Sequence, residues 1–146
     1  MPRPKHGARF VRSIVADTGP LVALFRGRDP DHSRVRRYLQ ENPCALVTTW
    51  LVVTEAWHLL GESAQLKLMR WIAVGGIAVL EMRPEDGRAM LALLEKYRDR
   101  PMDLADASLV MLAGRLRVAE ILTIDRADFD VYRLPGNRRF VQVLQA

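Results

Sequence analysis

The stretch SIVADTGPLVALF, residues 13–25, decides the architecture of the chain. Residues 14–16 form an apolar run that is typical of a buried strand, and Asp17 follows this run directly. The segment 18–20 interrupts the run with Gly and Pro, after which apolar residues recur with helical spacing. A buried strand that leads straight into a helix predicts a βαβ unit. It also leaves a carboxylate at the end of the strand, where burial of charge is unfavourable unless the acid caps the helix.

The same alternation continues along the chain. Strands are predicted at 13–17, 44–49, 77–82, 119–125 and 138–144, and helices at 19–27, 30–42, 49–61, 63–76, 84–100 and 102–117. Short apolar strands that alternate with helices form parallel sheets. We therefore expect an α/β fold, with a small twisted parallel sheet of four to five strands flanked by helices.

Length and composition limit the class of protein. The 146 residues favour one domain, 13–146, preceded by a flexible basic extension at 1–12. The lone Cys44 excludes an internal disulfide, and no apolar run reaches the roughly 18 residues that a membrane span needs. We expect a cytoplasmic protein without membrane contact. The net charge of +5 favours a polyanionic partner such as nucleic acid.

Acidic residues stand where charge is hard to bury. Asp17 and Asp125 each end a predicted strand, and the carboxyl ends of parallel strands meet at one edge of the sheet. Glu55 lies on or beside the apolar stripe of its helix. Asp103 and Asp106 share a helix face, where Asp103 suits the helix N-terminus and Asp106 points to a shared site.

Carboxylates that meet in one place favour a bound cation. Two of them about 5 Å apart repel by roughly 3 kcal/mol at an effective dielectric constant of about 20. Repulsion among four carboxylates would be large compared with the net stability of a domain, which is about 5–15 kcal/mol. Ligands that are all oxygen favour Mg²⁺ or Mn²⁺, which can activate water and stabilise charge on a phosphoryl group. Together with the basic chain, this predicts cleavage of a phosphodiester backbone.

Four segments, in this order, resemble the acidic motifs of the PIN-domain nucleases. They are IVADTGPLVALF (14–25), TTWLVVTEAWHLL (48–60), MDLADASLVMLAGRL (102–116) and ILTIDRADF (121–129). They are most similar to the VapC-type toxins of toxin–antitoxin systems. The resemblance implies a PIN-like domain, a ribonuclease that depends on Mg²⁺ or Mn²⁺, a homodimer, and a cognate antitoxin protein that blocks the site.

By position, the resemblance assigns the catalytic and metal-binding roles to Asp17, Glu55, Asp106 and Asp125. Two further acids and two threonines are accessory candidates: Asp103, Asp128, Thr18 and Thr123. The alignment does not decide between the two acids of the third motif, or between the two of the fourth. Thr18 matches a hydroxyl residue that often follows the first acid in the family. Thr123 shares one side of its strand with Asp125.

Basic and apolar residues suggest the partners. Candidates for contact with RNA phosphates are Arg34, Arg37, Arg115 and Arg126, although a solvated helix face is the favoured alternative for each one. The apolar segment 66–80 predicts a homodimer surface.

Two other functions stay open: an RNA-binding module that does not cut, and an RNA-processing nuclease outside any toxin pair. A phosphatase-like domain with Asp17 as nucleophile is disfavoured. Such an enzyme would usually carry a second Asp two residues on, and Gly19 occupies that position.

Overall fold

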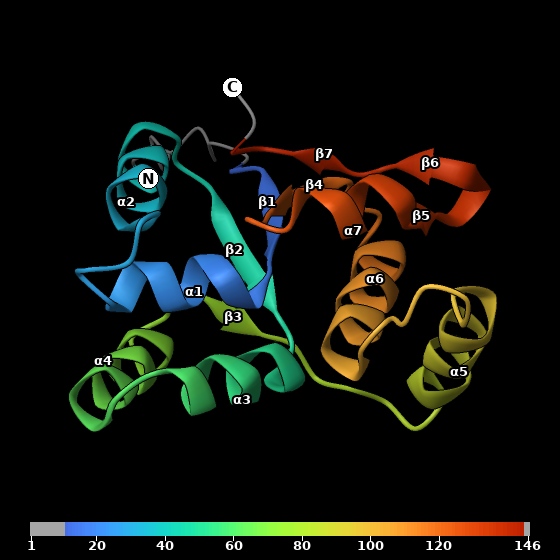
Figure 1. The fold of residues 1–146 in the computed structure, drawn as a ribbon, viewed down its shortest axis with the longest axis horizontal. Helices are drawn as coiled ribbons and strands as arrows, with labels where there is room; N and C mark the ends of the chain where they lie inside the picture. The colour runs from blue at the N-terminus through green and yellow to red at the C-terminus, as the bar shows by residue number, and fades with distance from the viewer. Residues whose placement is uncertain (1–10, 145–146) are drawn as a thin grey trace, which may run out of the picture.

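The computed structural model describes residues 11–144 around a five-stranded parallel sheet (Figure 1). Its strands are β1 (Ser13–Ala16), β2 (Ala45–Thr48), β3 (Ala78–Val79), β4 (Glu120–Leu122) and β7 (Val141–Gln142). They lie in the order β3-β2-β1-β4-β7, and each neighbouring pair is parallel. The predicted α/β fold, with its sheet of four to five strands, is confirmed.

Helices flank this sheet. They are α1 (Thr18–Phe25), α2 (His32–Glu41), α3 (Trp50–Leu59), α4 (Glu62–Ala73), α5 (Asp86–Lys96), α6 (Leu104–Leu116) and α7 (Arg126–Val131). In Figure 1, α1, α2 and α4 lie to the left of the sheet, α5 and α6 lie to the right, and α3 crosses below. An antiparallel pair, β5 (Arg133–Leu134) and β6 (Arg138–Arg139), follows α7 around the 3₁₀ turn η1 (Pro135–Asn137). The sequence did not predict α7 or this hairpin.

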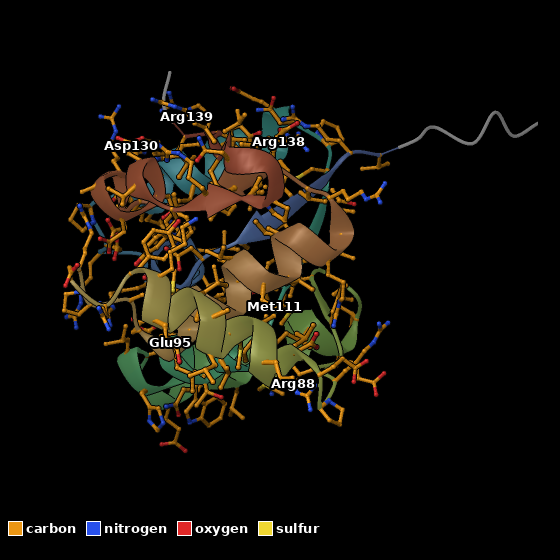
Figure 2. The ribbon with its side chains drawn as sticks, turned by 90° about the vertical axis from the view of Figure 1, so that its right-hand side faces the viewer. Arg88, Glu95, Met111, Asp130, Arg138 and Arg139 are labelled. Carbon is orange, nitrogen blue, oxygen red and sulfur yellow. The ribbon has the colours of Figure 1, made fainter. Side chains whose placement is uncertain are left out.

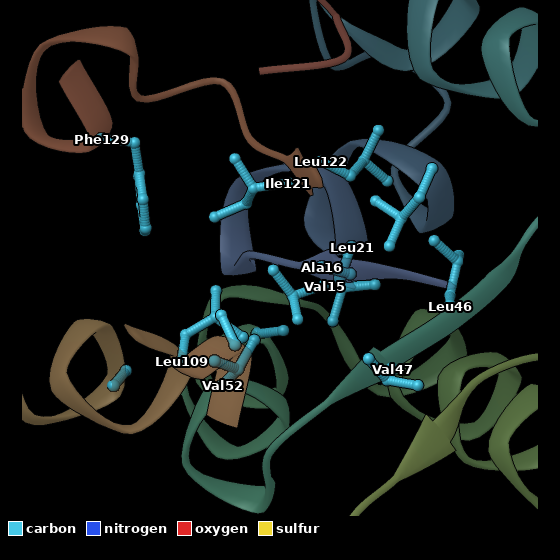
Figure 3. Packing of buried hydrophobic residues seen from close by; sticks show 14 of the residues in the cluster. Val15, Ala16, Leu21, Leu46, Val47, Val52, Leu109, Ile121, Leu122 and Phe129 are labelled. Carbon is cyan, nitrogen blue, oxygen red and sulfur yellow. The ribbon is translucent and has the colours of Figure 1, made fainter. Parts of the chain in front are cut away.

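The central position of β1 follows from its composition. Residues 14–16 are fully buried, as expected for a strand covered on both faces. Leu21 of α1, Val52 of α3 and Leu109 of α6 pack into the same core (Figure 3). The core therefore fixes β1 against the helices that carry the candidate acids.

Strand register sets where the site begins. Ala16 of β1 pairs with Leu122 of β4, and the Asp17 backbone N–H donates to the Leu122 carbonyl at 2.9 Å. The two strands therefore end side by side. As a result, Asp17 and Thr123 emerge next to each other at the carboxyl edge of the sheet.

The start of the described chain is tied to the opposite edge. Arg12 forms an ion pair with Glu120 at 3.1 Å, at the beginning of β4. Residues 1–10 of the predicted basic extension lie outside the described residues. Within 11–144, the helices are all too short or too polar to cross a membrane.

Candidate active site

A cleft of about 470 Å³ opens at the carboxyl edge of the sheet. Its walls come from the end of β1, from α3, from the start of α6 and from the start of α7. The lining residues are Asp17, Thr18, Gly19, Glu55, Leu59, Asp103, Asp106, Ile124, Asp125 and Asp128. The cleft therefore brings together all six acids that the sequence singled out.

Asp17 is the most deeply buried of these acids, with 7% of its surface exposed. It occupies the N-cap position of α1, yet its side chain makes no capping hydrogen bond within the described chain. Instead, the Thr123 hydroxyl donates to Asp17 Oδ2 at 2.8 Å. The pKa of Asp17 is raised to about 6, mainly by burial and less by the nearby charges of Glu55 and Asp125, while hydrogen bonds from the Thr123 hydroxyl and the Thr18 backbone act to lower it. The geometry disfavours a helix-capping role for Asp17.

Glu55 reaches the cleft from α3. The Thr18 hydroxyl donates to Glu55 Oε2 at 2.7 Å, which links the start of α1 to the middle of α3. The position of α3 is set at its N-cap, where Thr49 Oγ1 accepts from the Val52 backbone N–H at 3.2 Å. The same hydroxyl lies 2.8 Å from Ser108 Oγ of α6. The helices that carry Glu55 and Asp106 are thus joined by a buried hydrogen bond.

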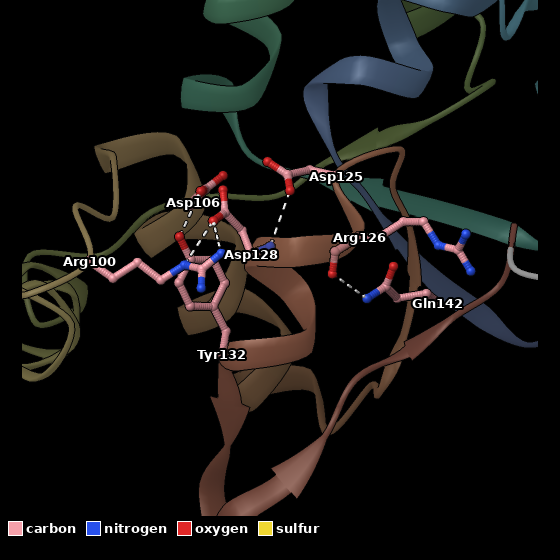
Figure 4. Close-up of polar contacts among 7 residues, drawn as sticks. All are labelled: Arg100, Asp106, Asp125, Arg126, Asp128, Tyr132 and Gln142. Carbon is pink, nitrogen blue, oxygen red and sulfur yellow. Dashed lines mark hydrogen bonds and ion pairs between the residues drawn. The ribbon is translucent and has the colours of Figure 1, made fainter.

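The two acids of the third motif have different local roles. Asp103 is the N-cap of α6, and its Oδ1 accepts from the Asp106 backbone N–H at 2.7 Å. The Asp106 carboxylate accepts instead from the Tyr132 hydroxyl at 3.0 Å (Figure 4). Burial raises the pKa of Asp106 to about 7, with the charges of Asp17 and Asp103 adding to the shift. The geometry favours Asp106 as the acid that acts in the cleft.

Tyr132 was missed by sequence reasoning. Its side chain is fully buried, and it donates to an acid that lies 26 residues earlier in the chain. Burial, followed by the negative charge of Asp106, raises the pKa of Tyr132, so the phenol remains a proton donor at neutral pH. Asp17, Glu55 and Asp106 are therefore each held by a hydroxyl group from a different part of the chain.

The two acids of the fourth motif also differ. Asp125 is the N-cap of α7, and its Oδ1 accepts from the Asp128 backbone N–H at 3.1 Å. Asp128 Oδ1 accepts from Arg100 Nε at 3.1 Å and lies 3.1 Å from Arg100 Nη2 (Figure 4). Asp128 therefore has a cationic partner. Within residues 11–144, no ion pair includes Asp125.

The oxygen-rich lining suits a hard cation. None of the described lining residues is Cys or His, and carboxylates with hydroxyls are the ligands that Mg²⁺ and Mn²⁺ prefer. Among residues 11–144, the ion pairs leave Asp17, Glu55 and Asp106 without a basic partner. No three acidic, His or Cys side chains of this described part already converge closely enough to share one ion. The chemistry of the lining residues therefore fits a divalent cation. Their carboxylates lie too far apart in this structure for three of them to contact one ion.

The arginines proposed for RNA contact lie in different surroundings. Arg34 of α2 pairs at 3.5 Å with Asp31, the N-cap residue of this helix, while Arg37 and Arg126 are exposed. Arg115 lines a separate pocket of about 660 Å³ between α5, α6 and the β5–β6 hairpin. Figure 2 faces this side of the molecule and labels Met111 of α6, which also lines that pocket. There Arg115 Nη1 donates to Asp86 Oδ2 at 2.7 Å, which gives Arg115 a structural partner. RNA contact by these arginines stays a prediction.

The fold and the four acidic segments together identify a protein family. The chain belongs to the PIN-domain family, because the family model described as PIN domain matches residues 14–134. This match includes all four of the motifs on which the resemblance was based.

Within the PIN-domain family, the chain is similar to particular VapC-type proteins. The chain is 32% identical over 134 residues to Ribonuclease VapC26 of Mycobacterium tuberculosis, which covers 89% of this chain and 99% of that protein. The fold matches VapC20 of M. tuberculosis, described as a sarcin–ricin loop cleaving toxin, with a TM-score of 0.72, 19% identity, and coverage of 78% of this chain and 91% of that one. It also matches a chain of a toxin–antitoxin complex from Klebsiella pneumoniae, with a TM-score of 0.61, 22% identity, and coverage of 84% and 93%. The resemblance to VapC-type proteins is confirmed.

Proposed function

We propose that the chain is a Mg²⁺- or Mn²⁺-dependent endoribonuclease, a hydrolase of RNA phosphodiester bonds, and the toxin of a toxin–antitoxin pair. The observation that carries the proposal is the cleft, in which Asp17, Glu55, Asp106 and Asp125 share about 470 Å³ without a basic partner in the described chain. The identity to a protein named as a ribonuclease and the net charge of +5 support it.

In this proposal, Asp17 and Asp106 hold the cation directly, because they are the acids whose burial most favours a positive partner. When bound, the ion supplies Lewis-acid stabilisation of the charge that develops on the phosphoryl oxygens. Glu55 and Asp125 complete the site, through water or at a second ion. Thr18 occupies Glu55 Oε2, so Glu55 Oε1 is the oxygen that orients the attacking water and takes its proton.

The proposed partners follow from the same reading. The substrate is RNA, and the names of the relatives support an antitoxin protein that binds this chain. The proposed location of both proteins is the cytoplasm. We also propose a homodimer that involves segment 66–80, where Leu66 is 48% and Val74 is 83% exposed. Light scattering at tens of micromolar should give twice the monomer mass, and a monomer would contradict the dimer alone.

The enzymatic proposal is tested with the purified full chain and a broad panel of RNAs. We expect internal cleavage with Mg²⁺ or Mn²⁺, loss of cleavage with EDTA, and recovery when metal is restored. The matched control is a preparation of Asp17→Asn made in the same way, which excludes contaminating nucleases. Wild-type protein that binds RNA tightly but cuts none of the panel in either metal would favour the non-cutting RNA-binding module.

A further inference from the structure

Arg100 is the basic residue that the structure joins to the acidic cleft. Residues 11–144 contain four ion pairs, and only the Arg100–Asp128 pair uses an acid that lines the cleft. Arg100 lies in the loop between α5 and α6, three residues before the α6 N-cap Asp103. Figure 4 shows its guanidinium reaching Asp128. The loop thus brings a fixed positive charge to the rim of the site.

The guanidinium is held by one of its two edges. Arg100 Nε and Nη2 both face Asp128 Oδ1 at 3.1 Å. A guanidinium has five N–H donors in a planar fork. The edge formed by Nη1 and the second N–H of Nη2 makes no hydrogen bond or ion pair with residues 11–144. The side chain is 43% exposed, so a ligand can reach Arg100 from solvent.

Asp128 sets the position of this edge relative to the acids. Its backbone N–H donates to Asp125 Oδ1 at 3.1 Å, within the first turn of α7. Arg100 is therefore connected to Asp125 through a single residue on a rigid helical turn. Because Asp128 lines the cleft, an anion bound by Arg100 lies beside Asp128, at the edge of the cleft.

We propose that Arg100 binds a phosphate of the RNA substrate through its Nη1/Nη2 edge, and that Asp128 is a positioning residue for Arg100 and not a metal ligand. This inference rests on the proposed ribonuclease function. The planar fork of arginine matches two phosphate oxygens, and such charge-assisted pairs are strong and directional. An RNA strand that has one phosphate bound to Arg100 is held in a fixed position relative to the acids while the neighbouring phosphate is attacked.

A second ion pair offers a matched control. Arg12 and Glu120 also lie 3.1 Å apart, and their exposed fractions of 45% and 31% are close to the 43% and 29% of Arg100 and Asp128. Arg12 precedes β1 and Glu120 begins β4, so this pair lies at the opposite edge of the sheet from the cleft. Removal of either arginine deletes one exposed cation and one exposed ion pair, but only Arg100 is near the acids.

The test measures binding separately from cleavage. In the full chain carrying Asp17→Asn, affinity for a fluorescein-labelled, mixed-sequence, single-stranded RNA is measured by anisotropy over a range of salt concentrations. We expect Arg100→Ala to reduce the slope of log K against log salt by about 0.7, the value for one phosphate contact on a single strand. In the active chain, the same change should lower kcat/KM about tenfold or more. Arg12→Ala should leave the slope and kcat/KM unchanged.

Arg100→Lys covers the possibility that Arg100→Ala disturbs the loop. Lysine keeps a positive charge that can still neutralise the phosphate, but it lacks the planar fork that binds two phosphate oxygens, so the salt slope should be retained while kcat/KM falls severalfold. Full cleavage by Arg100→Lys, or equal slopes for Arg100→Ala and Arg12→Ala, would overturn the inference and leave the ribonuclease proposal intact. If wild-type protein cuts no RNA but Arg100→Ala still reduces the slope, the ribonuclease proposal fails and the phosphate contact stands.

Discussion

Asp17 and Asp86 are buried to the same degree, yet the chain satisfies them in opposite ways. Asp86 is 6% exposed, and its Oδ2 accepts from Arg115 Nη1 and from the Arg83 backbone N–H, both at 2.7 Å. Asp17 is 7% exposed, accepts from the Thr123 hydroxyl, and has other acids around it. Equal burial of two carboxylates therefore does not imply the same role. The residue that donates to each carboxylate, an arginine for Asp86 and a threonine for Asp17, distinguishes them.

The difference lies in where the compensating charge comes from. For Asp86 it is part of the fold, so the attraction to Arg115 offsets the loss of hydration within the protein itself. For Asp17 the described chain supplies a hydroxyl but no cation, and burial raises its pKa to about 6. One region is complete as an architectural contact. The other lacks a positive partner in the described chain, which is why we propose that Asp17 binds a cation.

The largest expected effect separates the two acids by activity. Asp17→Asn should lower kcat/KM for RNA cleavage about a thousandfold, because it removes a charge that the proposed cation needs. Asp86→Asn, assayed at a temperature at which it is folded, should retain near wild-type kcat/KM. Comparable losses in the two variants would remove the distinction between them.

The next effect separates them by stability. Asp86→Asn should lower the free energy of unfolding by about 3–5 kcal/mol, because Arg115 is left partly buried without its counter-charge. Urea denaturation at pH 7, in the presence of EDTA, measures this loss. A loss below about 1 kcal/mol would place the pair with ordinary surface ion pairs.

Asp17→Asn should act in the opposite direction in metal-free protein. The folded-state pKa of about 6 exceeds the usual value of 3.8, so the folded protein binds this proton more tightly than the unfolded chain does. The associated stability is fully present below about pH 4 and is lost as the pH rises through about 6. Asparagine does not titrate. The variant should therefore match wild type near pH 4 and exceed it by up to about 3 kcal/mol at pH 8.

Melting curves in EDTA at the two pH values test this sign. A variant that melts lower than wild type at pH 8 would show that Asp17 stabilises the fold without metal. That result would make Asp17 resemble Asp86.

The smallest effect concerns the hydroxyl that Asp17 has in place of a cation. Thr123→Val keeps the shape of the side chain but removes the donor to Asp17 Oδ2, so Mn²⁺ affinity should fall about 10- to 100-fold. Thr48→Val is the matched control, since Thr48 is also buried but donates to the Ala16 carbonyl at 2.8 Å. Calorimetric titration with Mn²⁺ should separate the two variants. Equal affinities would show that Thr123 does not position a ligand.

Local pattern was enough to predict most of the fold and the acids of the cleft. Asp17 and Asp125 could be placed at one edge because strand ends are visible in the sequence, and parallel strands share an edge. The short helix α7 was missed because its six residues are too few to show a helical period. The sequence pattern that could have indicated the start of α7 is the acidic N-cap Asp125, followed by Asp128 in the first turn.

Tertiary partners could not be predicted in this way. Arg100 meets Asp128 across 28 residues, Tyr132 meets Asp106 across 26, and Arg115 meets Asp86 across 29. No spacing rule applies over such separations, because the contacts depend on how the helices dock. The sequence could therefore name the charged residues, but only the packed structure could tell an acid with an internal partner from one without.

The threonines of the cleft stabilise acids other than their neighbours in sequence. Thr18 follows Asp17 but donates to Glu55, 37 residues away, and Thr123 precedes Asp125 but donates to Asp17, 106 residues away. A substitution in one motif therefore affects the position of an acid in another motif. Across descendants of this chain, positions 18 and 55 should vary together, as should 123 and 17, more strongly than the adjacent positions 17 and 18. A lineage that lost the hydroxyl at 18 would regain function through a second substitution on α3, far from the first in the gene.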